Sequence, residues 1–260
     1  MFGLQRCSLV GMVHLLPLPG SPGWAGSAAA IRARAEADLA ALVEGGCDAV
    51  IVENMGDAPY LKRDVAPATL AAMAIAVDTI VRKSPVPVGV QVLAGANEAA
   101  LGVAVASGAS FLRVEGFAYA AVADEGWMDA CAGPLLRSRS ALGSQVEIWA
   151  DIQKKHSAHA VTADLDLADL ARGCAFCGAD AVVVTGGCTG ASTSPNDVML
   201  ASNGELPVIV GSGVTPADAG ELARVADALI VGSWLKVDGD WRNEVDVERV
   251  RTLRGAMGPR

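Results

Sequence analysis

Chemically reactive side chains follow apolar, strand-like runs at several points along the chain. His14 ends the run SLVGMVH, Glu53 follows the apolar run AVIV, and Asp151 lies near the end of VEIWADI. A carboxyl group and a second titratable group whose pKa values are pulled apart can act as general base and general acid, which contributes roughly 10²–10⁴-fold to a rate. The candidate catalytic residues are His14, Glu53, Arg113, Glu115, Asp151, Lys155 and His156.

The residue types leave more than one assignment of roles open. Asp151, Glu53 or Glu115 could be the general base, and His14 or His156 could be the acid. Lys155 could stabilise an enediolate, or form a Schiff base if its pKa is lowered by Lys154 and burial. Lys154 and Lys155 could equally be a solvated surface pair. His159, three residues beyond His156, is expected at the surface.

Two opposite charges stand two residues apart in the run SFLRVEG. Strand alternation places Phe111, Arg113 and Glu115 on one face, with Leu112 and Val114 on the other. Arg113 and Glu115 could pair at a functional site, or form a salt bridge that is only structural.

The stretch 206–236 reads as strand, glycine-rich turn, helix, strand and second glycine-rich turn. Backbone N–H groups in such turns are open to an anion because glycine carries no Cβ, and loops near the C-terminus of a TIM barrel often hold phosphate. The alternative is that these glycines only permit tight turns. The predicted phosphate-binding residues are Gly186, Gly211, Ser212, Gly213, Gly232 and Ser233.

Eight strand–helix units can be placed along the chain. The expected strands are 8–14, 47–54, 86–92, 110–116, 146–152, 179–185, 207–210 and 228–231, and the expected helices are 27–45, 67–83, 97–107, 130–142, 164–174, 195–201, 215–225 and 243–257. The pattern predicts one α/β domain over residues 1–260, a single (β/α)₈ TIM barrel, whose catalytic end collects the residues that end the strands. A doubly wound sheet is disfavoured because no G-x-G-x-x-G opens the chain. Residues 117–129 are expected to be a long loop acting as a lid or wall.

Composition narrows the classes of function. The chain of 260 residues is 52% hydrophobic and 19% charged, and its net charge is −9. Without a basic cluster it is not expected to bind nucleic acid, but a small phosphorylated substrate remains compatible. With no signal peptide and no apolar run of about 18–20 residues, direct membrane insertion is not expected and a cytoplasmic location is. TIM barrels often self-associate, and the five tryptophans offer surfaces for a homo-oligomer.

No cofactor is predicted, although a divalent metal is an alternative. The six cysteines suit reduced, buried thiols, and Cys174-x-x-Cys177 lacks the second pair that a zinc site needs. His14, Glu53, Asp151 and His156 could hold a divalent ion in a hydrolase. Against this, strand one carries no H-x-H and the chain has three histidines in all. A third class is a non-catalytic assembly factor that keeps a barrel scaffold.

Several motifs resemble those of the BtpA/SgcQ family. They are GMVHLLPLPGSP (11–22), VENMGDAPY (52–60), VGVQVLA (88–94), FLRVEGF (111–117), ADIQKKHS (150–157), VTGGCTG (184–190), GSGVT (211–215) and IVGSWLKVDG (230–239). They span nearly the whole chain in family order. The resemblance implies a barrel similar to the ribulose-phosphate-binding group and a family named for a role in photosystem I biogenesis. Glu115 stands where the family pattern has asparagine, which adds a charge at the barrel mouth.

Overall fold

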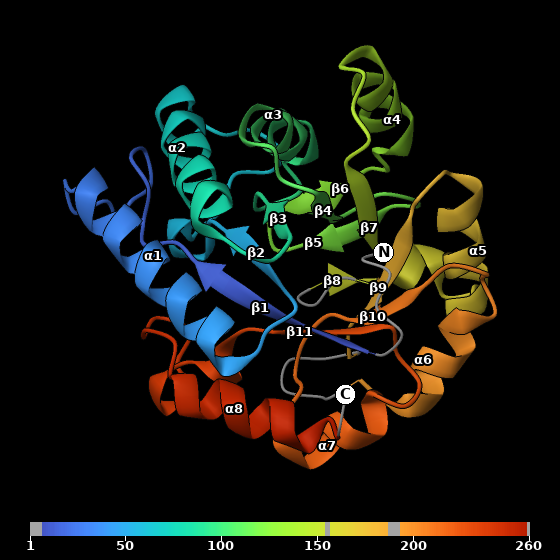
Figure 1. Ribbon diagram of the computed structural model, residues 1–260. Coiled ribbons are helices and arrows are strands. Elements are labelled where there is room, and N and C mark those ends of the chain that lie inside the picture. Colours follow the sequence, from blue (N-terminus) through green and yellow to red (C-terminus); the bar gives the residue numbers. More distant parts are fainter. Residues whose placement is uncertain (1–6, 154–156, 187–192, 259–260) are drawn as a thin grey trace.

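The computed structural model describes residues 7–153, 157–186 and 193–258. Eight parallel strands close into a barrel in the order β1-β2-β3-β4-β7-β9-β10-β11, and helices surround it (Figure 1). The barrel strands are β1 (Ser8–His14), β2 (Ala49–Glu53), β3 (Val88–Gln91), β4 (Phe111–Val114), β7 (Glu147–Asp151), β9 (Ala181–Val184), β10 (Val208–Val210) and β11 (Ala228–Val231). The predicted TIM barrel is therefore confirmed.

The barrel interior is filled by inward-facing side chains of alternate strand positions. Val10 and Met12 of β1 lie there, and Phe111 stacks on Trp149 with ring centroids 3.8 Å apart. Gly89 makes room for this stack, since a Cβ there would lie 2.2 Å from the Phe111 ring. The interior is thus a packed core, and polar side chains are left to the carboxyl ends of the strands.

The outer core lies between the barrel and its helices. The helices are α1 (Ala28–Gly45), α2 (Pro67–Lys83), α3 (Asn97–Ser107), α4 (Ala132–Ala141), α5 (Leu167–Phe176), α6 (Pro195–Ser202), α7 (Pro216–Leu222) and α8 (Val247–Ala256). Ser27, Asp166 and Ser194 cap three of them through their side-chain oxygens. None of the described helices is long and apolar enough to cross a membrane.

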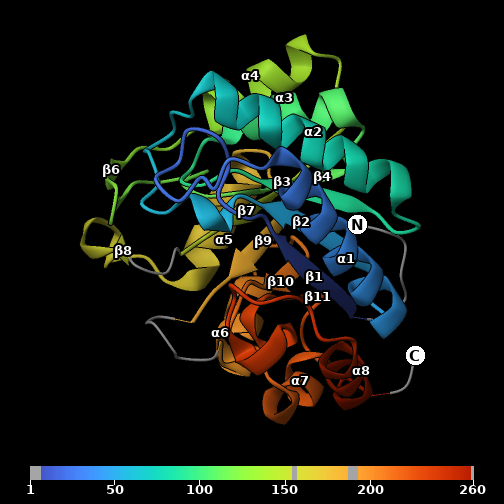
Figure 2. The ribbon, with the colours of Figure 1, turned by 90° about the vertical axis from the view of Figure 1, so that its left-hand side faces the viewer.

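The segment 117–129 is not the simple loop that we predicted. It contains β5 (Ala121–Ala123) and β6 (Gly126–Met128), which pair antiparallel, and β5 also pairs with β8 (Ser157–Ala158) from the loop after β7. This small sheet lies outside the barrel, with β6 and β8 together at one end of the molecule (Figure 2). The loops after β4 and β7 are therefore tied together beside the barrel mouth.

Candidate active site

The strand ends bring the predicted polar residues to one rim of the barrel. His14, Glu53, Gln91 and Asp151 are each the last residue of their strand. The register places His14 opposite Glu53 and Glu53 opposite Gln91. None of these four side chains belongs to a residue more than 8% exposed. Burying so many polar groups is costly, so their concentration at the rim where barrels carry their active sites marks a functional site.

His14 and Glu53 face each other across the first two strands. His14 Nε2 lies 3.6 Å from Glu53 Oε2, and His14 Nδ1 lies 3.4 Å from the Trp241 carbonyl oxygen. A carbonyl can only accept a hydrogen bond, so we assign the proton of the neutral imidazole to Nδ1. The Nε2 lone pair then points toward the Glu53 carboxyl group.

Burial shifts the two pKa values in opposite directions. Burial, aided by the charge of Lys236, lowers the pKa of His14 to about 3. Burial also raises the pKa of Glu53 to about 7, although the nearby Arg113 guanidinium acts to lower it. At neutral pH the pair is consequently a neutral imidazole beside a partly protonated carboxyl group, and not an ion pair.

Arg113 is the largely buried cation that lines both cavities of the mouth. Its Nε and Nη2 donate to the two oxygens of Asp151, each at 3.1 Å, and its Nη1 donates to the Gly211 carbonyl at 3.2 Å. The predicted pairing with Glu115 is wrong. The strands β4 and β7 are neighbours and Arg113 is opposite Trp149, so Asp151 lies within reach, whereas Glu115 stands beyond the end of β4.

Two adjoining cavities open at this rim. One has a volume of about 410 Å³ and reaches the loops after β10 and β11, and the other measures about 340 Å³ and lies toward β3, β4 and β7. We call them the loop cavity and the carboxylate cavity. They share Glu53, Met55, Arg113 and Ser212. A ligand can therefore occupy both while passing Glu53 and Arg113.

The loop cavity is walled by the predicted glycine-rich turns. Gly211, Ser212, Gly213, Gly232 and Ser233 all line it. Gly213 has φ +78°, which favours glycine. Within the described ranges, the N–H groups of Ser212, Gly213 and Ser233 find no acceptor. Such N–H groups suit a small anion.

The carboxylate cavity contains polar atoms with unused hydrogen-bonding capacity. Gln91 Oε1, Thr185 Oγ1 and Ser212 Oγ are buried and lack a partner in the part of the chain that the structure describes. All three side chains line this cavity. Buried polar atoms are nearly always paired, so three in one cavity indicate a place for a bound group.

Lys236 comes after the glycine-rich turn that follows β11, and it lines neither of the two cavities. It is fully buried, and its Nζ donates to Asp38 Oδ2 at 2.6 Å. Asp38 Oδ1 also accepts from the Val245 N–H at 2.8 Å. The Lys236–Asp38 pair thereby ties the segment that carries Trp241 to α1, and so supports the contact of Trp241 with His14.

The remaining predicted residues fall into two groups. Gly186 is the second residue after β9 and is buried, but it is absent from the described lining of both cavities. Lys155 and His156 lie outside the described residues, as does the rest of the loop after Gly186 up to residue 192. Their predicted roles remain predictions.

Sequence reasoning missed contributions from the connecting loops. Met55, Tyr60, Asp124 and Glu125 also line the carboxylate cavity. Met55 and Tyr60 lie within a quoted family motif, which was the one signal that pointed to them. Asp124 and Glu125 lie in the segment 117–129, which we expected to form a lid or wall. No periodic pattern singles out these two residues, because residues on loops carry neither strand nor helix spacing.

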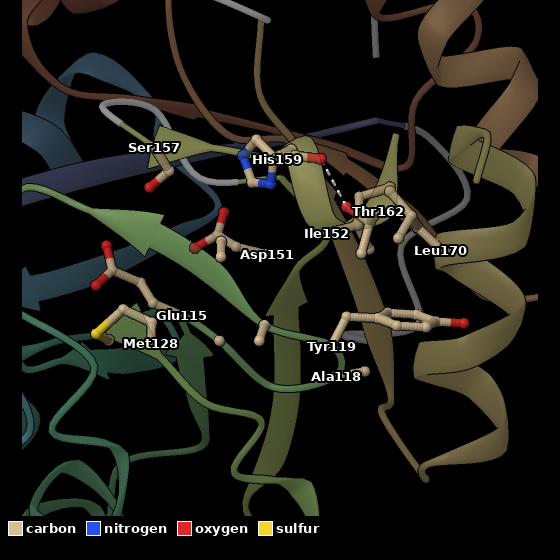
Figure 3. Close-up of a pocket in the computed structure, with 13 residues that line it drawn as sticks. Glu115, Ala118, Tyr119, Met128, Asp151, Ile152, Ser157, His159, Thr162 and Leu170 are labelled. Atoms are coloured by element: carbon tan, nitrogen blue, oxygen red, sulfur yellow. Dashed lines mark hydrogen bonds between the residues drawn. The ribbon is translucent and has the colours of Figure 1, made fainter. Parts of the chain in front are cut away.

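A small third cavity lies beside Asp151, under the three-stranded sheet. Glu115 and Asp151 project toward it from the barrel, and Ser157 and His159 approach from the other side (Figure 3). His159 is half-buried there, so it is partly exposed at the surface and also lines this cavity. The pairing of β8 with β5 draws this segment against the barrel mouth.

Among the described residues, the side chains named for a metal do not gather into a metal site. In residues 7–153, 157–186 and 193–258, no three His, Cys, Asp or Glu side chains are arranged to hold an ion. Asp151 is held by Arg113 on both oxygens. His156, the fourth member of the predicted set, is outside those ranges.

Solved structures resemble this chain in fold. Phosphoribosylanthranilate isomerase from Pyrococcus furiosus superposes with a TM-score of 0.59 at 14% identity, covering 98% of this chain and 100% of the other. Thiamine phosphate pyrophosphorylase from Pyrococcus furiosus superposes with a TM-score of 0.57 at 15% identity, covering 96% and 94%. The expected likeness to ribulose-phosphate-binding barrels is thus confirmed at the level of the fold.

Relatives in sequence cover nearly the whole chain. A mitochondrial protein of Caenorhabditis elegans is 42% identical over 95% of this chain and 91% of its own length. The photosystem I biogenesis protein BtpA of Synechocystis is 38% identical over 96% and 87%. The model of the BtpA family matches residues 5–258. The chain belongs to the BtpA family.

Proposed function

We propose that this protein is an enzyme that acts on a phosphorylated sugar or nucleotide-derived small molecule. The reaction would be of the isomerase, epimerase or lyase type, carried by general acid–base chemistry. The observation that supports this most is the pair of adjoining cavities. One offers unpaired backbone N–H groups, the other offers carboxyl groups, and both are bordered by Glu53 and Arg113.

The phosphate would be held in the loop cavity. Its donors would be the N–H groups of Ser212, Gly213 and Ser233. The names of two solved structures of the same fold contain phosphate compounds, a phosphoribosyl compound and thiamine phosphate. This supports the phosphate assignment by analogy, since fold alone does not fix function.

Glu53 is the residue best suited to move a proton. A pKa of about 7 leaves it able to give or take a proton at neutral pH. His14 is the less suited donor because its pKa of about 3 leaves little imidazolium. The Nε2 lone pair of His14 would instead face the protonated Glu53 as a hydrogen-bond acceptor and orient its carboxyl group.

Arg113 would stabilise negative charge that develops on the substrate, and Asp151 would hold its guanidinium plane in place. Glu115, Lys155 and His156 remain further candidates for proton transfer. We also retain the cytoplasmic location as a prediction.

A thermal-shift screen tests this proposal. The probes are inorganic phosphate, pentose and hexose phosphates, nucleotides, and divalent metals with and without chelator. A ligand at 100 times its Kd adds about 2.7 kcal/mol of stability, a shift of a few degrees. Stabilisation by sugar phosphates, insensitive to chelator, is the expected result.

Two other outcomes would replace the proposal. Destabilisation by chelator, restored by Zn²⁺ or Mn²⁺ with phosphates silent, would favour the metal-dependent hydrolase. No response to any small molecule would favour an assembly role, as the name of the Synechocystis relative indicates for that protein.

A further inference from the structure

Apart from the backbone N–H groups that are proposed to hold phosphate, the mouth contains a second set of buried polar atoms that have no hydrogen-bond partner among the described residues. Gln91 comes from the end of β3, Thr185 follows β9, and Ser212 lies in the loop after β10. Gln91 is 3% exposed and Thr185 6%. All three residues line the carboxylate cavity, and no described residue bonds to these oxygens.

The chemistry of these groups selects the ligand. A hydroxyl group of a ligand can both donate and accept, as can the hydroxyls of Thr185 and Ser212, while Gln91 offers an amide. Leaving all three buried and unpaired would cost stability, whereas a polyhydroxylated ligand would satisfy them. Glu53 adjoins Gln91 in the strand register and adds a carboxyl group.

The charge of the carboxylate cavity excludes a second phosphate there. Among its described lining residues five are acidic, and Arg113 is the single cation. The Arg113 guanidinium already donates hydrogen bonds to both carboxylate oxygens of Asp151. A second phosphate would meet net negative charge in a partly buried space, which is unfavourable.

We infer that the carboxylate cavity is a hydroxyl-binding subsite, formed by Gln91, Thr185 and Ser212, that takes the polyol end of a sugar monophosphate. The inference rests on the proposed function for the position of the phosphate. The inference goes beyond the proposed function in two ways. It places the polyol end of the ligand, and it predicts a sugar monophosphate and not a bisphosphate.

Titration calorimetry with defined probes tests the inference. The probes are inorganic phosphate, ribose 5-phosphate, ribulose 1,5-bisphosphate and free ribitol. Ribose 5-phosphate should bind more tightly than inorganic phosphate, and more tightly than the bisphosphate. Thr185→Val and Gln91→Leu should each weaken ribose 5-phosphate by about tenfold and leave inorganic phosphate unchanged.

Stability of the free protein separates a binding role from a structural one. Thr185→Val removes a hydroxyl that has no described partner, so its Tm should stay the same or rise. Thr69→Val is the matched control, because its buried hydroxyl donates to the Pro19 carbonyl at 2.7 Å and it lines neither cavity. This control should lower the Tm and leave every ligand affinity unchanged.

The outcomes also separate this inference from the proposed function. If inorganic phosphate does not bind but ribitol binds and is weakened by Thr185→Val, the phosphate assignment fails and the subsite stands. If the bisphosphate binds more tightly than ribose 5-phosphate, the inference is overturned. It is likewise overturned if the Gln91 and Thr185 variants bind both ribose 5-phosphate and ribitol like the wild type.

Discussion

Glu53 Oε2 lies 3.6 Å from His14 Nε2, and the two residues are direct neighbours in the register of β1 and β2. The Trp241 carbonyl fixes the proton of His14 on Nδ1. The imidazole can therefore accept a hydrogen bond from Glu53, and a protonated Glu53 is the form that this contact favours. The pair thus links the strand register to a proton position in the mouth.

The raised pKa of Glu53 predicts a pH-dependent stability. The folded pKa of about 7 lies above the ordinary value of 4.5. Its contribution to stability is fully present below pH 4.5 and is lost as the pH rises through about 7. His14 acts in the opposite sense, since its contribution is present above pH 6.5 and is lost as the pH falls through about 3.

Glu53→Gln keeps the shape of the side chain and removes the charge. Relative to the wild type, its Tm should therefore rise progressively between pH 4.5 and about 7 and then level off. His14 is present in both proteins, so its own contribution largely cancels in this comparison. The exposed Glu221→Gln is the control. A Glu53→Gln offset that does not change across this window would contradict the assigned pKa.

The Arg113–Asp151 pair predicts a large cost for removing one partner. Asp151→Asn leaves the Arg113 guanidinium largely buried without its bidentate partner, and should lower the free energy of unfolding by about 3 kcal/mol. Asp78→Asn breaks the exposed pair with Arg82 and should cost less than about 1 kcal/mol. Urea denaturation measures both. Equal losses of unfolding free energy in the two variants would contradict the larger contribution that we assign to the buried pair.

Gly211 is packed so closely that a larger residue there should disturb the site. An added Cβ would lie 2.6 Å from Val183 Cγ1 and 2.7 Å from Thr185 Oγ1, and 3.1 Å from Arg113 Nη2. Gly211→Ala should therefore lower the Tm and displace two residues of the mouth. Gly102→Ala is the control, because nothing lies within 4 Å of its Cβ in α3. That change should stabilise by about 1 kcal/mol, and a neutral Gly211→Ala would refute the packing described.

Much of the fold could be predicted because its signals are local. The bounds of β1, α2, α3 and β11 agree with those read from apolar runs, proline and capping residues. The small sheet could not be predicted, since β5, β6 and β8 are two or three residues long and β8 pairs across more than 30 positions. Short strands have too few residues to show alternation.

The sequence predicted which strand ends form the site, but it did not predict which side chains pair with one another there. Sequence alone could not choose between Glu115 and Asp151 for Arg113, because the choice depends on which strands are neighbours and where β4 ends. The burial of Lys236 depends on Asp38, which is 198 positions away in α1. Such long-range partners leave no periodic signal.

The central claim is that the loops after β10 and β11 bind the phosphate of the substrate. The most direct test is a phosphorus NMR titration of ribose 5-phosphate with the wild type, Gly213→Asp and Gly213→Asn. Asparagine and aspartate have nearly the same shape and both tolerate φ +78° better than most residues, so the pair isolates the effect of a negative charge. Broadening or shift of the phosphate resonance that persists with Gly213→Asn and disappears with Gly213→Asp is the predicted result. An identical response from all three proteins would contradict the account.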